Sequence, residues 1–532
     1  MARQVALARR ISWLPVVTLA VLGGIAVGAV GRVGPDWPAQ EFRAWLASHA
    51  GVGAWNDAWY SGHALPGYSV LYPPVSALFG ATITGILAAT LCAWGAVRLA
   101  TTHAAYRRRV TFAVAATATA CVLDSLIIGQ IPFLLGAAAG VHAVVAVKLR
   151  QPLLALSLAT ACSLSSPLAG LFLAIVGLAW LPELRWRRAW PFAGSMLGSV
   201  VAAVLGGGSG TFPSDVYTVA SMIAFVTLGL IVVPRRHATI RRAVLVYGFV
   251  AAILIVVPNP VGGNIDRLGR LVAIPLALWV IASLDRGQRR RRWAIITVTV
   301  SAALLWHLYP VVSAVERADD DPSNTARYYA GLLNFLATQD PTRGRLEIPF
   351  TREHWESSFV APHFPLARGW ERQLDLAYND VLYHPLSAAS YKAWLDASAV
   401  DLVAVPGAPL DYGGAAEGVL LRHAPNYLRV VYRDENWTVY QVASPAPLIN
   451  GDRATLDQIG PSSVAVRFTE PGTTTIKVHD SPLWQTNSPT ACLEPSTDGW
   501  LHVHDSRPEL VTITASVTMS SILHRAGPYC ST

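Results

Sequence analysis

Charged residues are scarce in this chain. Only 14% of its 532 residues are Asp, Glu, Lys or Arg, whereas 53% are hydrophobic. The mean hydropathy is +0.39, and an average soluble domain carries about 25% charged residues. The composition therefore excludes an ordinary soluble enzyme and indicates that most of the chain lies in a lipid bilayer.

The motifs of several enzyme classes are also missing. No CxxC, HExxH, P-loop or GxGxxG motif occurs in a context that supports it. Their absence argues against thiol redox chemistry, a zinc protease, and nucleotide binding through a glycine-rich loop. The residues alone predict no metal site.

Apolar runs of membrane-spanning length follow one another between residues 12 and 311. A bilayer core about 30 Å thick needs about 20 apolar residues per helix. Residues 152–182 are divided in two, because a single span would place Arg185, Arg187 and Arg188 on the side opposite to the other basic loops. The runs predict eleven spans: 12–31, 74–97, 110–128, 131–147, 152–163, 167–182, 190–206, 216–233, 241–257, 269–284 and 293–311.

The basic residues are confined to one part of the chain. Residues 1–311 carry 25 Lys and Arg against 8 Asp and Glu, whereas residues 312–532 carry 16 against 25. The formal net charge of +8 therefore belongs to membrane loops and does not indicate a nucleic-acid partner. Lys and Arg in short loops stay in the cytoplasm, and here they form six clusters, beginning with Arg3, Arg9 and Arg10. We expect a multi-pass protein of the cytoplasmic membrane with a cytoplasmic N-terminus.

An odd number of spans places everything after residue 311 outside the cytoplasm. We expect a polytopic membrane domain at 1–311, an α/β domain at 312–445 and a β-sandwich-like domain at 446–532, from runs such as DLVAVP and period-2 stretches such as SSVAVRF and LVTITASV. Cys492 and Cys530 are the only cysteines of this part. Because the compartment is oxidising, we expect them to form a disulfide.

Residues 32–73 form the first and longest outer loop of the membrane half. The loop contains Asp36, Glu41, Arg43, Asp57 and His63 among many Trp and Tyr residues. An interfacial aromatic belt accounts for the rings but does not account for the carboxylates.

Three further polar features are expected on the same side of the membrane. Asp124 lies near the outer end of the third span, where a carboxylate is costly enough to suggest a function. Arg267 and Arg270 end the loop PNPVGGNIDRLGR, and His307 with Tyr309 ends the last span. A carboxylate can deprotonate a hydroxyl nucleophile, and Arg can hold the phosphate of a lipid-linked leaving group.

This layout resembles that of the GT-C glycosyltransferases. DAWYSGHALPGYSVLYPP, RGWERQLDLAYNDVLY and YKAWLDASAVDLVAVP look like stretches of GT-C-type multi-spanning proteins of actinobacteria. The resemblance implies a polyprenyl-phosphate-linked sugar as donor, with Asp36 as the first-loop carboxylate that activates the acceptor hydroxyl. It implies that Arg267 and Arg270 contact the donor phosphate. Asp124 stands near a second acidic motif of some members but lacks an acidic partner, which weakens a divalent-metal site without excluding one.

The other polar residues of the first outer loop have simpler explanations beside a functional one. Glu41 and Arg43 either form a local ion pair or contact substrate. Asp57 and His63 either hold the loop by hydrogen bonds, or orient the acceptor, with Asp57 as a substitute base.

We therefore expect a membrane glycosyltransferase that transfers a sugar to a cell-envelope glycan or lipid on the outer face of the membrane. A transporter or flippase is one alternative, with SLSSPLAG at 163–170 as a candidate helix break. A non-catalytic envelope protein that binds glycan through its outer domain is another. The sequence leaves the sugar, the acceptor, the linkage and the oligomeric state open.

Overall fold

The computed structural model describes residues 13–31, 34–102, 108–204, 210–494, 497–517 and 530. The chain forms two compact units. Unit 1 comprises Met1–Trp37, Gly67–Ala203 and Gly210–Glu316, and unit 2 comprises Pro38–Pro66, Val204–Ser209 and Arg317–Thr532. The prediction had divided the chain at residue 312, so the structure differs in grouping Pro38–Pro66 with the C-terminal residues.

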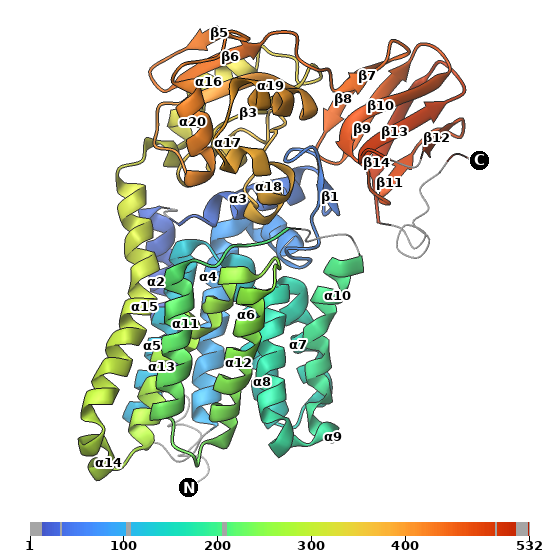
Figure 1. Cartoon of the computed structure of the whole chain (residues 1–532). Coiled ribbons are helices and arrows are strands. Elements are labelled where there is room, and N and C mark those ends of the chain that lie inside the picture. Colours follow the sequence, from blue (N-terminus) through green and yellow to red (C-terminus); the bar gives the residue numbers. More distant parts are fainter. Residues whose placement is uncertain are drawn as a thin grey trace. The chain divides into compact units, whose positions relative to one another are not determined.

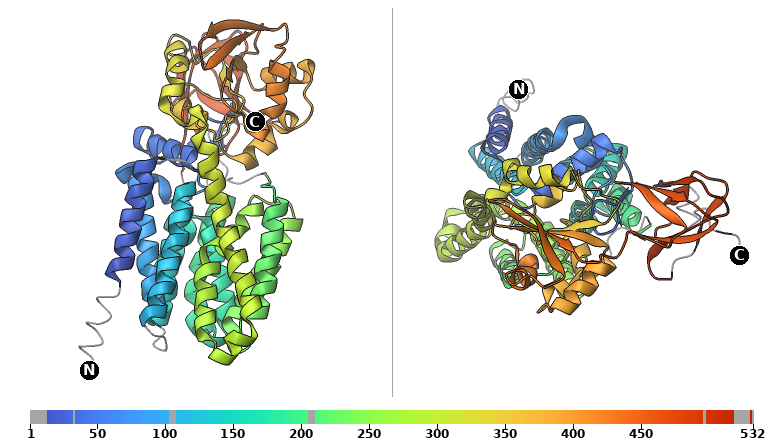
Figure 2. Two further views of the ribbon diagram at one scale, coloured as in Figure 1. Left: turned by 90° about the vertical axis from the view of Figure 1, so that its left-hand side faces the viewer. Right: turned by 90° about the horizontal axis from the view of Figure 1, so that it is seen from above.

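Unit 1 is helical, and its long helices run side by side (Figure 1; Figure 2, left). Its long helices are α2 (Leu14–Val30), α4 (Tyr72–Thr101), α5 (Arg108–Ile128), α6 (Ile131–Lys148), α7 (Pro152–Ser165), α8 (Pro167–Leu184), α11 (Val216–Val232), α12 (Ala238–Val256), α13 (Asp266–Ser283) and α15 (Trp293–Asp319). Short elements between them are α9 (Trp186–Ala189), η1 (Trp190–Met196), α10 (Leu197–Val204), η2 (Gly262–Ile265) and α14 (Arg286–Arg291).

Six helices of the described residues are long and apolar enough to cross a membrane, namely α4, α5, α6, α8, α12 and α15. Three shorter apolar helices, α2, α7 and α11, accompany them. The chain is thus a multi-pass membrane protein, but the predicted count of eleven spans is not confirmed. The predicted span 190–206 is a 3₁₀ turn followed by an eight-residue α-helix, and α13 begins with three charged residues in its first five positions.

Residues 152–182 form two helices because the chain turns at Ser166. Ser166 adopts an extended conformation, caps α8 by accepting a hydrogen bond from Ala169 N, and is followed by Pro167. Ser163, one turn earlier, donates to Gly194 O at 2.9 Å and accepts from Gly198 N at 3.1 Å. A Cβ on Gly198 would lie 1.9 Å from Ser163 O, so this close contact requires glycine.

The first part of unit 2 is an α/β fold around a four-stranded sheet in the order β3-β4-β6-β5. Strand β3 pairs with β4 in parallel, whereas β4, β6 and β5 are antiparallel neighbours. The strands are β3 (Arg345–Glu347), β4 (Val400–Pro406), β5 (Leu428–Arg433) and β6 (Trp437–Val442). The helices are α3 (Trp37–His49), α16 (Ala326–Leu336), α17 (Glu356–Phe359), α18 (Arg372–Tyr378), α19 (Ala388–Ala397) and α20 (Ala415–Leu421), with 3₁₀ turns η3 (Pro322–Asn324), η4 (Asp380–Tyr383) and η5 (Tyr412–Gly414).

The second part of unit 2 consists of two four-stranded sheets, in the orders β12-β13-β10-β7 and β11-β14-β9-β8. Alternate residues along β10 and β13 are buried, as expected for strands with one face in a core. Cys492 on β12 forms a disulfide with Cys530, which confirms the predicted pair. The strands are β7 (Ile449–Asn450), β8 (Ala454–Gly460), β9 (Ser463–Phe468), β10 (Gly472–His479), β11 (Trp484–Thr486), β12 (Ala491–Glu494), β13 (Trp500–Asp505) and β14 (Leu510–Ala515).

Residues 38–66 are built into unit 2. They include the hairpin β1 (Trp55–Asn56) and β2 (His63–Ala64). Trp55 belongs to the apolar core of the sandwich and lies 5.5 Å from the Trp484 ring. Trp59 donates from Nε1 to Ser357 O at 3.2 Å. The first outer loop is therefore a structural component of a fold that is completed only by residues after 316.

Candidate active site

Asp36 is held at the end of helix α5. Its backbone N donates to Ile128 O at 3.1 Å, and Trp37 donates from Nε1 to Ile127 O at 3.0 Å. The backbone at Gly34 packs directly against that of Ile128, since a Cβ on Gly34 would lie only 2.3 Å from the Ile128 backbone. Only 7% of Asp36 is exposed. Asp36 is thus a fixed, largely buried carboxylate of unit 1, and not a solvated loop residue.

The loop before helix α13 is equally fixed. The Asn259 side chain accepts hydrogen bonds from Val261 N and Gly262 N at 2.8 and 2.9 Å, and donates to Leu254 O at 2.6 Å. Gly262 has φ +44°, and a Cβ there would lie 1.9 Å from Phe212 O. This position therefore requires glycine. The loop delivers Asp266 and the two arginines that follow to the first turns of α13.

The two arginines of α13 each contact a carboxylate. Arg267 Nη2 lies 3.2 Å from Asp36 Oδ2, and Arg270 Nε lies 3.0 Å from Asp266 Oδ2. The Arg267 guanidinium also lies 6.0 Å from the centre of the Phe133 ring, and its buried Nε has no hydrogen-bond partner among the described residues. The structure thus brings together Asp36 and Arg267, which are 231 residues apart in the sequence. Arg267 retains N–H groups directed away from Asp36.

Asp124 lies on α5, one helical turn before the carbonyl that holds Asp36. Its Oδ2 lies 2.5 Å from His307 Nε2 on α15, and His307 is 6% exposed. The sequence indicated both residues on one side of the membrane but did not predict that they pair. Nearby on α15, Tyr309 packs against Tyr217 with ring centres 4.7 Å apart.

Three other predicted site residues lie in unit 2. Arg43 Nη2 lies 2.5 Å from Glu371 Oε1, and the same oxygen is 3.8 Å from His63 Nε2. Tyr60 donates from its hydroxyl to Glu371 O at 3.0 Å. Burial lowers the pKa of His63 from its ordinary value, so the imidazole is neutral at pH 7. These contacts join the first outer loop to residues near 371. Glu41 lies half-buried on α3.

Asp57 is enclosed in the interior of unit 2. It is 1% exposed, and its Oδ1 accepts from Trp55 Nε1 at 2.6 Å. Burial raises the pKa of the Asp57 carboxyl well above its ordinary value. Because a sugar hydroxyl cannot reach this carboxylate without opening the fold, we do not retain Asp57 in the proposed catalytic set.

A buried charged cluster in unit 2 was not identified from the sequence. Arg368 donates to Asp375 through Nε at 2.9 Å and Nη2 at 2.6 Å, and to Glu417 through Nη1 at 2.7 Å. Glu347 Oε1 lies 3.8 Å from the same guanidinium, and burial raises the pKa of the Glu347 carboxyl well above its ordinary value. The charge density of RGWERQLD was the only signal in the sequence. All four side chains are 1% exposed or less, so the cluster is structural.

Metal binding finds no support in the geometry of the described residues. No group of three His, Cys, Asp or Glu side chains there could hold an ion. A divalent ion therefore stays an untested expectation.

The candidate site joins a carboxylate held at the end of α5 to a guanidinium in the first turn of α13, in a multi-pass membrane protein with a β-rich C-terminal region. No family model and no curated protein matches the chain.

Two solved structures have a backbone fold similar to that of this chain. One is the arabinofuranosyltransferase AftD from Mycobacteria, at 12% identity and a TM-score of 0.45, covering 98% of this chain and 60% of that one. The other is ArnT from Cupriavidus metallidurans bound to undecaprenyl phosphate, at 13% identity and a TM-score of 0.43, covering 81% of this chain and 98% of that one. This chain thus spans less than two thirds of the AftD structure.

Proposed function

We propose that the protein is a glycosyltransferase that moves a sugar from a polyprenyl-phosphate donor to a cell-envelope glycan or lipid at the outer face of the membrane. The observation that supports this proposal is the contact of 3.2 Å between Asp36 and Arg267. The contact brings the Asp36 carboxylate, which is held at the end of α5, next to a guanidinium in the first turn of α13.

Asp36 is the general base of the proposed reaction. A sugar hydroxyl is a poor nucleophile near pH 7, so a carboxylate must accept its proton as the new bond forms. The acceptor oxygen then bonds to the anomeric carbon of the donor sugar. The bond between this carbon and the phosphate oxygen breaks, and its electron pair leaves with polyprenyl phosphate. Asp36 is fixed through its backbone N at Ile128 O, which limits the reorganisation that catalysis requires.

Arg267 stabilises the departing phosphate. A guanidinium offers five N–H donors in one plane, and the contact with Asp36 uses the Nη2 end. The remaining N–H groups can bind phosphate through charge-assisted hydrogen bonds, which are about twice as strong as neutral ones. Arg270 is already paired with Asp266 at 3.0 Å. Its charge is therefore partly neutralised, and it attracts a phosphate less strongly than Arg267 does.

The same geometry links donor binding to the state of the base. Before the donor binds, the negative charge of Asp36 faces the Arg267 guanidinium. A donor phosphate competes for that guanidinium, and as it binds it weakens the hold of Arg267 on Asp36. Because a carboxylate paired less strongly with a cation is a better base, Asp36 gains basicity when the donor is in place. This coupling favours binding of the donor before proton transfer and limits futile attack by water.

The test uses the purified full-length protein in lipid nanodiscs. Radiolabelled polyprenyl-phosphate pentoses and hexoses are offered together with a delipidated cell-envelope fraction, and transfer of label is measured. Asp36→Asn is expected to lower the rate by about 10²- to 10⁴-fold, the usual contribution of a general base. Glu316→Gln is the matched control, since Glu316 is an exposed carboxylate of the same unit. A wild-type rate in Asp36→Asn would refute the assignment of the base.

A further inference from the structure

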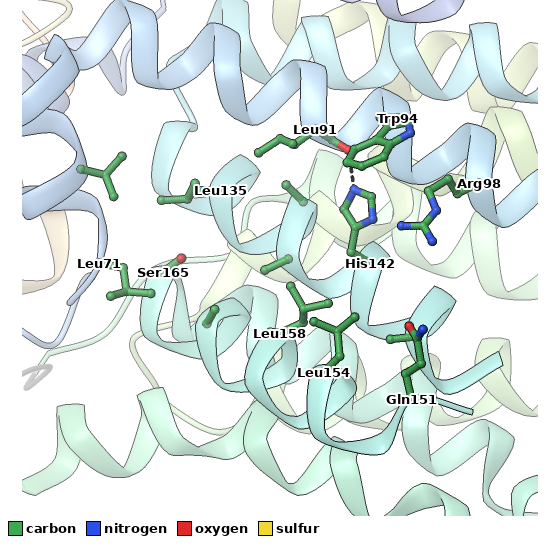
Figure 3. A pocket seen from close by; sticks show the side chains of 15 residues that line it. Leu71, Leu91, Trp94, Arg98, Leu135, His142, Gln151, Leu154, Leu158 and Ser165 are labelled. Atoms are coloured by element: carbon green, nitrogen blue, oxygen red, sulfur yellow. Dashed lines mark hydrogen bonds between the residues drawn. The ribbon is translucent and has the colours of Figure 1, made fainter. Parts of the chain in front are cut away.

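A cavity lies in unit 1, between helices α4, α6 and α7. Its volume is about 440 Å³. Figure 3 shows Leu71 and Ser165 at one end and Arg98 with Gln151 at the other, with leucine side chains between them. None of the residues proposed for the transfer reaction lines it. The cavity is therefore separate from the candidate active site.

The lining is apolar along most of its length and polar at one end. Leu91, Leu135, Leu154 and Leu158 are among the apolar lining residues. Two of them, Leu91 and Leu154, are exposed, as is usual for side chains that face lipid. Such a groove accepts a hydrocarbon chain, since lipid tails and leucine are equally apolar.

The polar end carries a fixed positive charge. Arg98 lies in the last turn of α4, with its guanidinium carbon 5.4 Å from the centre of the Trp94 ring. His142 accompanies it, held at 3.2 Å from Leu91 O and packed 5.0 Å from Trp94. In Figure 3 the Arg98 and His142 side chains lie next to each other. The Trp94 ring, the His142 ring and the Arg98 guanidinium therefore form one corner of the cavity, which we call the basic corner.

The sequence around this corner is basic. Residues 67–184 contain six Lys and Arg residues and two acidic residues, Asp124 and Glu183. Glu183 forms an ion pair with Arg242. Asp124 is 16 positions along α5 from the basic start of that helix, which corresponds to about 24 Å, and it lies 2.5 Å from His307. The positive charge at Arg98 is thus not balanced by nearby acidic residues, so the corner favours an anionic group.

The volume limits the length of the occupying chain. If one carbon with its hydrogens takes roughly the 30 Å³ of one water molecule, about 440 Å³ holds about fifteen carbons. This corresponds to one fatty acyl chain and is far too small for a whole polyprenyl chain. Basic pockets between transmembrane helices are suited to anionic lipid headgroups.

We infer that this cavity binds one acyl chain of an anionic phospholipid, whose phosphate lies at Arg98. The lipid comes from the leaflet at the basic ends of α4 and α6. Lys148 in the last turn of α6 adds a second positive charge at that end, with its Nζ 3.1 Å from Thr102 Oγ1. The inference does not depend on the proposed glycosyl transfer.

The experiment is native mass spectrometry of the full-length protein titrated with phosphatidylglycerol or phosphatidylcholine of equal chain length. Both lipids carry a phosphate that can accept hydrogen bonds from Arg98, but the choline ammonium of phosphatidylcholine neutralises the charge of its headgroup. We therefore expect phosphatidylglycerol, whose headgroup has a net negative charge, to bind at least about tenfold more tightly beside the positive charges of Arg98 and Lys148. Arg98→Ala should weaken phosphatidylglycerol more than phosphatidylcholine, so that the preference for the anionic lipid is lost. Arg109→Ala is the matched control, since Arg109 is an exposed arginine at the start of α5 and does not line the cavity. Ala139→Phe, which fills the groove, should weaken both lipids.

Several results would overturn the inference. Equal affinities of the wild type for the two lipids need no variant and would exclude a preference for anionic headgroups. Equal losses in Arg98→Ala and Arg109→Ala would show a diffuse surface effect. Displacement of phosphatidylglycerol by millimolar inorganic phosphate would identify a free-phosphate site. Tighter, Arg98-dependent binding of polyprenyl phosphate would assign the cavity to the lipid carrier. A melting curve for each variant checks that the fold is retained.

Discussion

The pair of Asp36 and Arg267 leads to an unusual prediction for donor affinity. In Asp36→Asn the side chain keeps its shape but loses its charge, so the guanidinium no longer has a carboxylate 3.2 Å away. We expect the variant to bind the donor phosphate more tightly than the wild type while its transfer rate falls. A residue that only held the donor would show the opposite change in affinity.

The magnitude follows from the contact that is lost. A hydrogen bond to a charged group contributes about 1.5–3 kcal/mol, and Asp36 is only 7% exposed, so solvent screens the pair weakly. If the donor must replace this contact completely, its affinity rises by about 10- to 150-fold in the variant. Because Arg267 can keep one N–H on Asp36 while it binds phosphate with others, we expect the lower value, about tenfold.

The assay measures binding of polyprenyl phosphate without its sugar, so that no turnover intervenes. Titration calorimetry in nanodiscs gives the Kd of the wild type, Asp36→Asn, Arg267→Ala and Arg270→Ala. Arg267→Ala should weaken binding by at least about tenfold, and Arg270→Ala by less, since Arg270 is paired with Asp266. Weaker binding in Asp36→Asn would refute the competition between carboxylate and phosphate. Equal losses in the two arginine variants would refute the separate role of Arg267.

Three further predictions concern stability and the support of the site. Cys492→Ser should lower the melting temperature of unit 2, since a disulfide closing 38 residues contributes about 4 kcal/mol in the loop-entropy model; an unchanged melting temperature would contradict this. Burial raises the pKa of Glu356 to about 8, so the folded state binds the proton more tightly and stability should fall as pH rises from about 4.5 to about 8. Glu356→Gln should flatten that decline in denaturant titrations, and an unaltered slope would exclude Glu356 as its source. Gly262→Ala should weaken polyprenyl-phosphate binding with helix content retained by circular dichroism, because a Cβ at φ +44° meets Phe212 O; wild-type affinity would show that the loop adjusts.

The sequence was sufficient where one physical rule dominates. Two cysteines alone in a domain expected to face an oxidising compartment predicted the disulfide. Apolar runs predicted the long helices of unit 1 to within a few residues, except that α15 continues to Asp319, and residues 190–206 do not form a single helix. Positive-inside topology placed Asp36 and Arg267 on the same side of the membrane. Four basic residues of 1–311 lie outside the six clusters, and two of them, Arg267 and Arg270, are those of the candidate site.

The sequence was insufficient where the partner is set by tertiary structure. Arg43 had a local candidate in Glu41, but its guanidinium contacts Glu371, 328 residues away. The sequence left open whether Asp57 is a substitute base or a carboxylate that holds its loop by hydrogen bonds, because the loop was assigned to the membrane half, whereas Asp57 is buried in unit 2 and accepts from Trp55. The two residues of such an ion pair lie in different segments, and neither differs from ordinary charged residues in its own segment. No local sequence pattern therefore reveals the pair. His307 was noticed without its partner for the same reason.

The membership of Pro38–Pro66 in unit 2 has a consequence for how the protein is made. These residues leave the ribosome early, but Trp59 acquires its contact with Ser357 only 298 residues later. At about 5–20 residues per second, the interval is roughly 15 to 60 s. During this time the aromatic-rich segment Pro38–Pro66 exists without the residues that later bury it. A chain that stops near residue 316 therefore has an orphaned segment close behind Asp36, and we expect the quality-control machinery of the cell to treat such fragments as unfolded. We consequently expect Pro38–Pro66 to fold only when the residues after 316 are present.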